Sequence, residues 1–245
     1  MVPYGLVLSD ELQEVYLDFK EKKDFDQDIV QRLFQYFKGL FITNTAQMKR
    51  IGRELTPEVE QQLRGAGYTT QSLEDLAKKT VYKIILTTDN NTFPHVNIHG
   101  DAIENNLSGC FMRGDRREKA ISHIKALCDK AKEVFIYDKY ITSGGSERRN
   151  QENLNCLASL FPRKHLRIVH RDGHLKEADI NFLMGICNKW TFEKKMDLPD
   201  HHDRYLIVDN KMEIVLTSGF SSLTDTTKEF TYIVRPVTQS RFERR

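Results

Sequence analysis

The stretch HDRYLIVD, residues 202–209, decides the fold of the C-terminal half of this sequence. Its Tyr, Leu, Ile and Val residues are typical of a buried β-strand. Because side chains alternate between the two faces of a strand, His202 and Arg204 are expected to project from the same face. An imidazole beside a fixed positive charge is the combination that phosphate-ester chemistry needs. The stretch therefore predicts a phosphate site at the end of a strand.

The sequence around this stretch alternates between predicted strands and predicted helices. Strands are predicted over residues 134–141, 165–170, 191–196, 202–209 and 213–216, with helices over 152–161 and 177–190. Strands that alternate with helices indicate an α/β fold, a sheet with helices packed on it. The chain is divided into a region 1–110, mainly helical with a short strand pair at 81–87 and 94–98, and a domain 111–245.

Two further segments add to a similarity between this sequence and a known protein family. The octapeptide is similar to the His-x-Lys-x4-Asp motif of the phospholipase D superfamily, with Arg204 where the family has lysine. The segment TSGFSS, residues 217–222, resembles the family's Gly-Ser-x-Asn segment, and Glu229 stands where the family often has another polar site residue. The resemblance covers residues 133–237, and it implies a phospholipase D-like mixed sheet with flanking helices.

The resemblance also implies a set of catalytic residues. His202 would attack the phosphorus and form a phosphohistidine, which water or an alcohol then resolves. Arg204 would neutralise the non-bridging oxygens, Asp209 would fix the end of the strand, and Glu229 would orient the imidazole of His202. The chemistry requires no metal ion and no cofactor. The same resemblance implies that Ser221 and Ser222 donate hydrogen bonds to the phosphate.

Other segments are candidates for contact with substrate. The element 138–140, Asp-Lys-Tyr, resembles an Asp-x-Tyr element near the site of many phospholipase D-like domains, so Tyr140 is expected to line the pocket. A packed strand tyrosine is an equally good interpretation. The loop 143–150 ends in Arg148 and Arg149 and is a candidate to grip a phosphate backbone, although a surface turn has the same composition.

The chain contains one clear copy of the motif, whereas the family mechanism uses two histidines. Residues 95–97, His-Val-Asn, are a distant echo of a second copy, but Asp101 comes one residue too early to complete it. One motif per chain implies instead a homodimer in which two His202 residues meet across a twofold axis.

Composition narrows the class of protein. The chain has 245 residues, 39% hydrophobic and 29% charged, and no apolar run approaches the roughly 18 residues of a membrane span. We expect no secretion signal, and the four scattered cysteines favour reduced thiols in the cytoplasm. The net charge is only +2, but the stretches 113–119 and 163–167 are locally basic. They either guide a polyanion or form solvated surface.

These observations lead to one main functional prediction and two alternatives. The main prediction is a phospholipase D-like phosphodiesterase, a metal-independent nuclease with nucleic acid as its partner, in mobile-element or phage-defence biology. The first alternative is a catalytically degenerate module that binds nucleic acid or a phosphoinositide headgroup. The second is hydrolysis of lipid or of another phosphodiester. Region 1–110 would serve recognition, regulation or partner binding.

Overall fold

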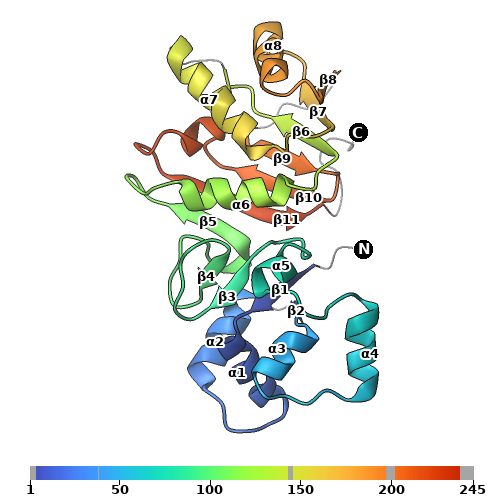
Figure 1. Ribbon diagram of the computed structural model, residues 1–245. Coiled ribbons are helices and arrows are strands. Elements are labelled where there is room, and N and C mark those ends of the chain that lie inside the picture. Colours follow the sequence, from blue (N-terminus) through green and yellow to red (C-terminus); the bar gives the residue numbers. More distant parts are fainter. Residues whose placement is uncertain (1–3, 38, 143–145, 197–201, 238–245) are drawn as a thin grey trace. The chain divides into compact units, whose positions relative to one another are not determined.

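The computed structural model describes residues 4–37, 39–142, 146–196 and 202–237. The chain forms two compact units, Met1–Asn106 and Leu107–Arg245 (Figure 1). This division comes just before the strand β5 (Ser108–Phe111), which pairs within the second unit. The boundary predicted after residue 110 falls inside that strand.

The first unit contains a four-stranded parallel sheet in the order β2-β1-β3-β4. Its strands are β1 (Gly5–Leu8), β2 (Leu40–Ile42), β3 (Ile85–Thr87) and β4 (His95–Asn97). The predicted strand pair corresponds to β3 and β4, whereas β1 and β2 are additional. All four residues of β1 are buried, so this strand has no alternation of polar and apolar residues that would mark it in the sequence.

Five helices accompany this sheet, and polar residues cap their first turns. They are α1 (Asp10–Lys20), α2 (Gln27–Tyr36), α3 (Thr45–Arg50), α4 (Pro57–Gly65) and α5 (Leu73–Ala77). The Ser9 side chain accepts a hydrogen bond from the amide of Leu12, and Asn44 does the same for Gln47. Such bonds satisfy amide groups that have no partner within the helix. The core of the unit includes Leu6, Leu8 and Leu33.

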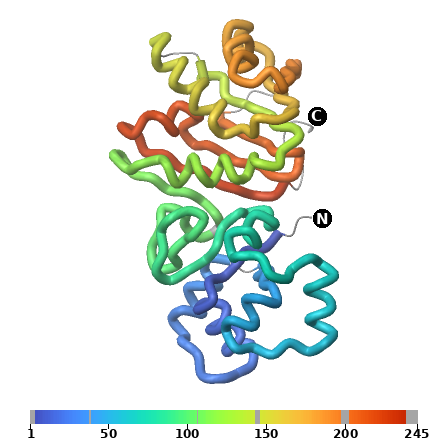
Figure 2. Tube along the Cα trace, viewed as in Figure 1, coloured from blue at the N-terminus to red at the C-terminus, as the bar shows by residue number. Residues whose placement is uncertain are grey.

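The second unit is built on a seven-stranded sheet in the order β5-β11-β10-β9-β6-β7-β8. Besides β5, its strands are β6 (Glu133–Tyr137), β7 (Leu166–Arg171), β8 (Trp190–Lys195), β9 (Arg204–Val208), β10 (Met212–Leu216) and β11 (Phe230–Pro236). β6, β7 and β8 pair in parallel, and the other neighbours are antiparallel. The first and last strands, far apart in the sequence, run side by side (Figure 2).

Three helices complete this unit: α6 (Glu118–Cys128), α7 (Glu147–Leu160) and α8 (Glu177–Ile186). α7 contacts both α6 and α8, and it also contacts the short 3-10 helix η2 (Phe220–Leu223). The predicted fold class, an α/β fold in which helices flank a mixed sheet, is confirmed.

The pairing of the strands brings four segments to one end of the sheet. Arg204, at the start of β9, lies opposite Leu216, at the end of β10. Tyr205 lies opposite Tyr137, at the end of β6. Because β10 and β11 are also antiparallel, the start of β11 lies at the same end. The segments that carry most of the predicted site residues therefore meet there.

Candidate functional site

His202 and Arg204 lie at this end of the sheet, as the motif requires. His202 is exposed on the segment that leads into β9. The Arg204 side chain is 25% exposed, so its charge is partly shielded from water but open to a ligand. The strand begins at Arg204, so His202 precedes the strand on which the sequence placed it, and the two residues present an exposed imidazole and a half-buried cation.

Three segments contact the guanidinium of Arg204. Its Nη1 atom donates a hydrogen bond of 3.4 Å to the carbonyl oxygen of Thr217, after β10. Its Nε atom is 4.0 Å from Oδ1 of Asp138, after β6. Its central carbon lies 5.2 Å from the ring centroid of Tyr140, a distance at which a cation and an aromatic ring attract each other. Tyr140, predicted to line the pocket, is 50% exposed and does lie beside the motif cation.

Asp138 is a buried carboxylate at the centre of this arrangement, and only 1% of it is exposed. Its Oδ1 atom accepts a hydrogen bond from the amide of Tyr140, and its Oδ2 atom accepts one from the amide of Phe220, both at 2.9 Å. Burial raises the pKa of Asp138, while the two amides and Arg204 act in the opposite direction. The sequence drew attention to Tyr140 in this element and missed Asp138 as a site residue.

The turn of small residues after β10 packs directly against Asp138. Gly219 has a φ of +81°, a conformation that residues with a side chain rarely adopt. A Cβ atom at Gly219 would lie 2.8 Å from Oδ2 of Asp138 and 3.6 Å from Cγ of Arg204. The glycine is therefore needed for the backbone conformation and for the close approach of the carboxylate.

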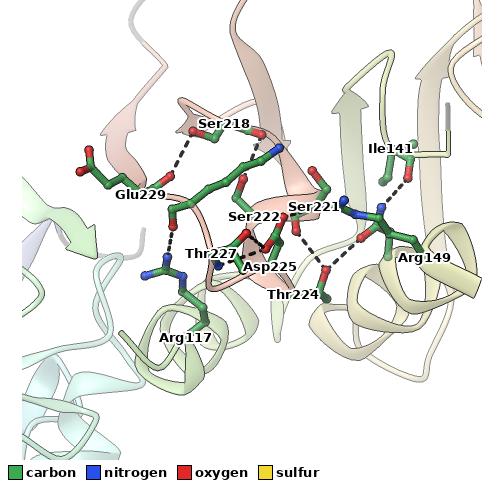
Figure 3. A network of polar contacts seen from close by, with 12 residues as sticks. Arg117, Ile141, Arg149, Ser218, Ser221, Ser222, Thr224, Asp225, Thr227 and Glu229 are labelled. Carbon is green, nitrogen blue, oxygen red and sulfur yellow. Dashed lines mark hydrogen bonds and ion pairs between the residues drawn. The ribbon is translucent and has the colours of Figure 1, made fainter. Parts of the chain in front are cut away.

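The two serines predicted to bind phosphate lie in this turn (Figure 3). Ser222 is buried, and its hydroxyl donates a hydrogen bond of 3.1 Å to the carbonyl oxygen of Ser218. Ser221 is half-buried, and its carbonyl oxygen accepts a bond of 3.0 Å from the hydroxyl of Thr224. The hydroxyl of Ser222 is thus engaged within the fold, which makes Ser221 the better candidate to meet a ligand.

Glu229 lies on the exposed segment just before β11. Its carbonyl oxygen accepts a bond of 3.3 Å from the hydroxyl of Ser218, and its carboxylate points away from Ser218 and Ser222 (Figure 3). The backbone of Glu229 therefore joins the turn, and its predicted action on the imidazole of His202 stays a prediction.

Arg148 and Arg149 lie in the first turn of α7, and they differ in what they contact. The Arg148 side chain is 90% exposed and forms an ion pair of 3.0 Å with Glu152, one turn further along the helix. Arg149 forms an ion pair with Asp225, which ties α7 to the connection between β10 and β11 (Figure 3). Residues 143–145 of the predicted loop lie outside the described residues. Of the two arginines, Arg148 has its charge better placed to attract an anion.

Asp209, the last residue of the motif, lies at the other end of β9. It is about 16 Å from Arg204 along the strand, since each residue adds about 3.3 Å. Its Oδ1 atom accepts hydrogen bonds from the amides of Lys132 at 2.8 Å and Glu133 at 2.9 Å. The structure therefore does not bring Asp209 together with His202. Its contacts fix the strand end, the action proposed for it from the sequence.

The N-terminal echo of the motif lies in the first unit. His95 is on β4, where its Nε2 atom is 3.9 Å from the Glu74 carboxylate. Both oxygens of Asp101 accept hydrogen bonds from amides, those of Asn97 and Ile103. Both His95 and Asp101 therefore have partners inside the first unit.

The described residues offer neither a metal-binding cluster nor a membrane-spanning helix. No group of three or more His, Cys, Asp or Glu side chains in that part is arranged to hold a metal ion. None of the helices described there is long and apolar enough to cross a membrane.

Comparisons with known proteins find similarity among solved structures only. No protein-family model matches the sequence, and no curated protein matches it. Nuc from Salmonella typhimurium, a phospholipase D family member, is 20% identical with a TM-score of 0.30, over 52% of this chain and 79% of its own. NucT from Helicobacter pylori is 12% identical with a TM-score of 0.33, over 52% and 84% of the two chains. Yeast tyrosyl-DNA phosphodiesterase is 12% identical with a TM-score of 0.26, over 53% and 32%.

Proposed function

We propose that the second unit is a phospholipase D-like phosphodiesterase that cleaves nucleic acid without a metal ion. The observation that carries this proposal is the pairing of an exposed His202 with a half-buried Arg204 at one end of the sheet. The small-residue turn at 217–222 lies at the same end. These are an accessible nucleophile, a cation and a backbone that a phosphate can approach closely.

The proposed reaction has two steps. In the first, the imidazole of His202 attacks the phosphorus, so a P–N bond forms and the bond from phosphorus to the leaving oxygen breaks. In the second, water attacks the phosphorus and gives its proton to the group that protonated the leaving oxygen, the P–N bond breaks and the imidazole is regenerated. Arg204 stabilises the negative charge on the non-bridging oxygens in both transition states.

The leaving oxygen needs a proton in the first step, and a second histidine is the natural donor. Each chain has one complete motif, so we propose that the donor is His202 of a second copy in a homodimer. A twofold interface brings the same residue from both chains to one place. Analytical ultracentrifugation tests this, because a protein that cleaves as a monomer would contradict it.

Cleavage assays test the proposal directly. Purified protein is incubated with end-labelled single- and double-stranded DNA and RNA in the presence of EDTA. We expect wild-type protein to cleave at least one of these, His202→Ala to be inactive, and the control His165→Ala to be active, because His165 is an exposed histidine elsewhere in the same unit. Acid quenching is expected to trap a phosphohistidine in the wild type only. A His202→Ala protein that cleaves at the wild-type rate would refute the proposal.

A second candidate function, binding without cleavage, is favoured by one observation. The cation of the motif is an arginine, and its guanidinium already contacts Thr217, Tyr140 and Asp138. A cation held in this way suits retention of a phosphate group. A wild-type protein that binds oligonucleotide but never cleaves it would support this alternative. Binding to phosphoinositide-containing vesicles in place of oligonucleotide would identify a lipid headgroup as the ligand.

A further inference from the structure

Asp138 is linked to its own loop and to two segments that are distant in the sequence. One oxygen binds the amide of Tyr140 in its own loop, and the other binds the amide of Phe220, which is 82 positions away. Arg204 of β9 is the third neighbour, with its Nε atom 4.0 Å from Oδ1. Burying a carboxylate costs free energy unless such partners offset it. This position therefore retains a costly charge beside the motif cation.

The Arg204 side chain has several rotatable bonds, so a fixed pose requires fixed partners. The carboxylate is immobilised by two amides, and it faces the Nε side of the guanidinium. The carbonyl of Thr217 holds Nη1. The Nη2 atom makes no hydrogen bond with any of the described residues. It is the donor that we expect to meet a phosphate oxygen.

We propose that Asp138 is a positioning residue for the phosphate site, one that holds Arg204 and the turn at Gly219 and Phe220 in a fixed relation. The inference rests on the proposed function, because it names what orients the cation of that same site. Asp138 itself does not touch the substrate. It acts through Arg204, whose planar guanidinium binds phosphate well only in one orientation.

The packing of Gly219 supports this proposal independently. A methyl group at this position would meet Oδ2 of Asp138 at 2.8 Å, so the turn accommodates the carboxylate at contact distance. A residue that only satisfied backbone amides would have no need to lie beside the motif cation. Asp101 offers a comparison in the first unit, because its two oxygens also accept amides at 3.0 Å.

A double-mutant cycle tests whether Asp138 acts through Arg204. All proteins carry His202→Ala to prevent cleavage, and the dissociation constant for a fluorescent single-stranded oligonucleotide is measured. We expect Asp138→Asn to raise this constant about tenfold when Arg204 is present, equivalent to about 1.4 kcal/mol. In an Arg204→Lys background we expect less than a twofold change, because an ammonium has no planar fork to orient. Equal losses in the two backgrounds, or no loss in either, would overturn the proposal.

Two further variants separate positioning from loss of folding. Asp101→Asn is the matched control, and we expect it to lower the melting temperature while the dissociation constant stays within twofold. Gly219→Ala leaves the charge of Asp138 unchanged but displaces its carboxylate, and we expect a loss of affinity like that of Asp138→Asn. If Asp101→Asn weakens binding as much as Asp138→Asn does, the effect is general destabilisation and the proposal fails.

The same cycle with inorganic phosphate, followed by NMR of labelled protein, separates this proposal from the proposed function. If the two residues are coupled in phosphate binding but the wild type does not cleave nucleic acid, only the nuclease function is refuted. If the wild type cleaves but the two residues show no coupling, only the positioning role is refuted. If the wild type binds neither phosphate nor oligonucleotide, both are refuted.

Discussion

The two ends of β9 carry residues of the same short motif, and they have different tasks. At the start of the strand, Arg204 is partly exposed, and His202 just before it is exposed. At the other end, Asp209 accepts two backbone amides and has a φ of +51°. Residues that belong to one short motif in the sequence therefore need not lie together in one site. One end of the strand is suited to a ligand, and the other secures the start of β6.

The largest effect that we predict is at the ligand end. Under the proposed function, Arg204→Ala should lower the rate of nucleic-acid cleavage about 100- to 1000-fold, because it removes the charge proposed to stabilise the transition state. Its free energy of unfolding should change by no more than about 1 kcal/mol, since the side chain is partly solvated. Kinetic assays and urea titrations measure the two quantities. Arg64→Ala, a change at an exposed arginine of the first unit, is the control. A loss of rate below tenfold would contradict the difference that we draw between the two ends of β9.

At the other end of β9, we predict that substitutions affect stability rather than cleavage. Asp209→Ala should lower the free energy of unfolding by about 3 kcal/mol, because two amides lose their acceptor and alanine tolerates a positive φ poorly. Asp209→Asn should cost about 1 kcal/mol, since asparagine keeps an acceptor and adopts this conformation more readily. Urea titration measures both changes. If Asp209→Ala is as stable as the wild type, Asp209 does not secure the strand.

The thiol of Cys128 reports on local opening at the end of β9 that carries Asp209. Burial, and to a smaller extent Asp209, raises the pKa of the Cys128 thiol, and Cys128 is fully buried. We expect Cys128 to be inert to thiol reagents in the native wild type and to react faster in Asp209→Ala. Mass spectrometry of the labelled peptides measures this. Equal reactivity in the two proteins would mean that this end of the unit does not open when Asp209 is lost.

The smallest effect concerns the pH dependence of stability at the ligand end. Burial raises the pKa of Asp138 above its ordinary value of 3.8, so the folded state holds this proton more tightly than the unfolded state. The contribution of Asp138 to stability is thus greatest below that value and is lost as the pH rises through the folded-state pKa. The unfolding free energy of the wild type relative to Asp138→Asn should fall as the pH rises above 3.8. A rise in this free energy with pH would show that Arg204 and the two amides lower the pKa of Asp138 more than burial raises it.

The sequence predicted the local features of this fold better than the distant ones. The strands and helices of the second unit follow the expected order, because each has its own periodic pattern over several residues. The strand β1 was missed because its four buried residues carry no such pattern, and β2 was missed because it has only three residues. Local signals find an element when the element is long enough to show a period.

The same distinction between local and distant signals applies to the residues of the candidate site. His202 and Arg204 were proposed because they stand two positions apart in one short stretch, although the strand itself begins only at Arg204. Asp138 was missed as a site residue because its partners Phe220 and Arg204 lie in other elements, η2 and β9. Arg149, predicted to bind substrate, pairs with Asp225, 76 positions away, which no local pattern reveals. Ser222, also predicted to bind substrate, has its hydroxyl engaged by Ser218 within its own turn. Tertiary pairing therefore determines which polar residues are available to a ligand.

The pairing of β5 with β11 has a consequence for how the protein is made. β5 is the first strand of its unit to leave the ribosome and β11 is the last, so the edge of the sheet cannot close until synthesis of the unit is complete. Until then, β5 presents unpaired backbone groups, which are a template for association with other chains. The first unit, which precedes β5 in the chain, is free to fold earlier. During translation we expect the second unit to depend on chaperones more than the first.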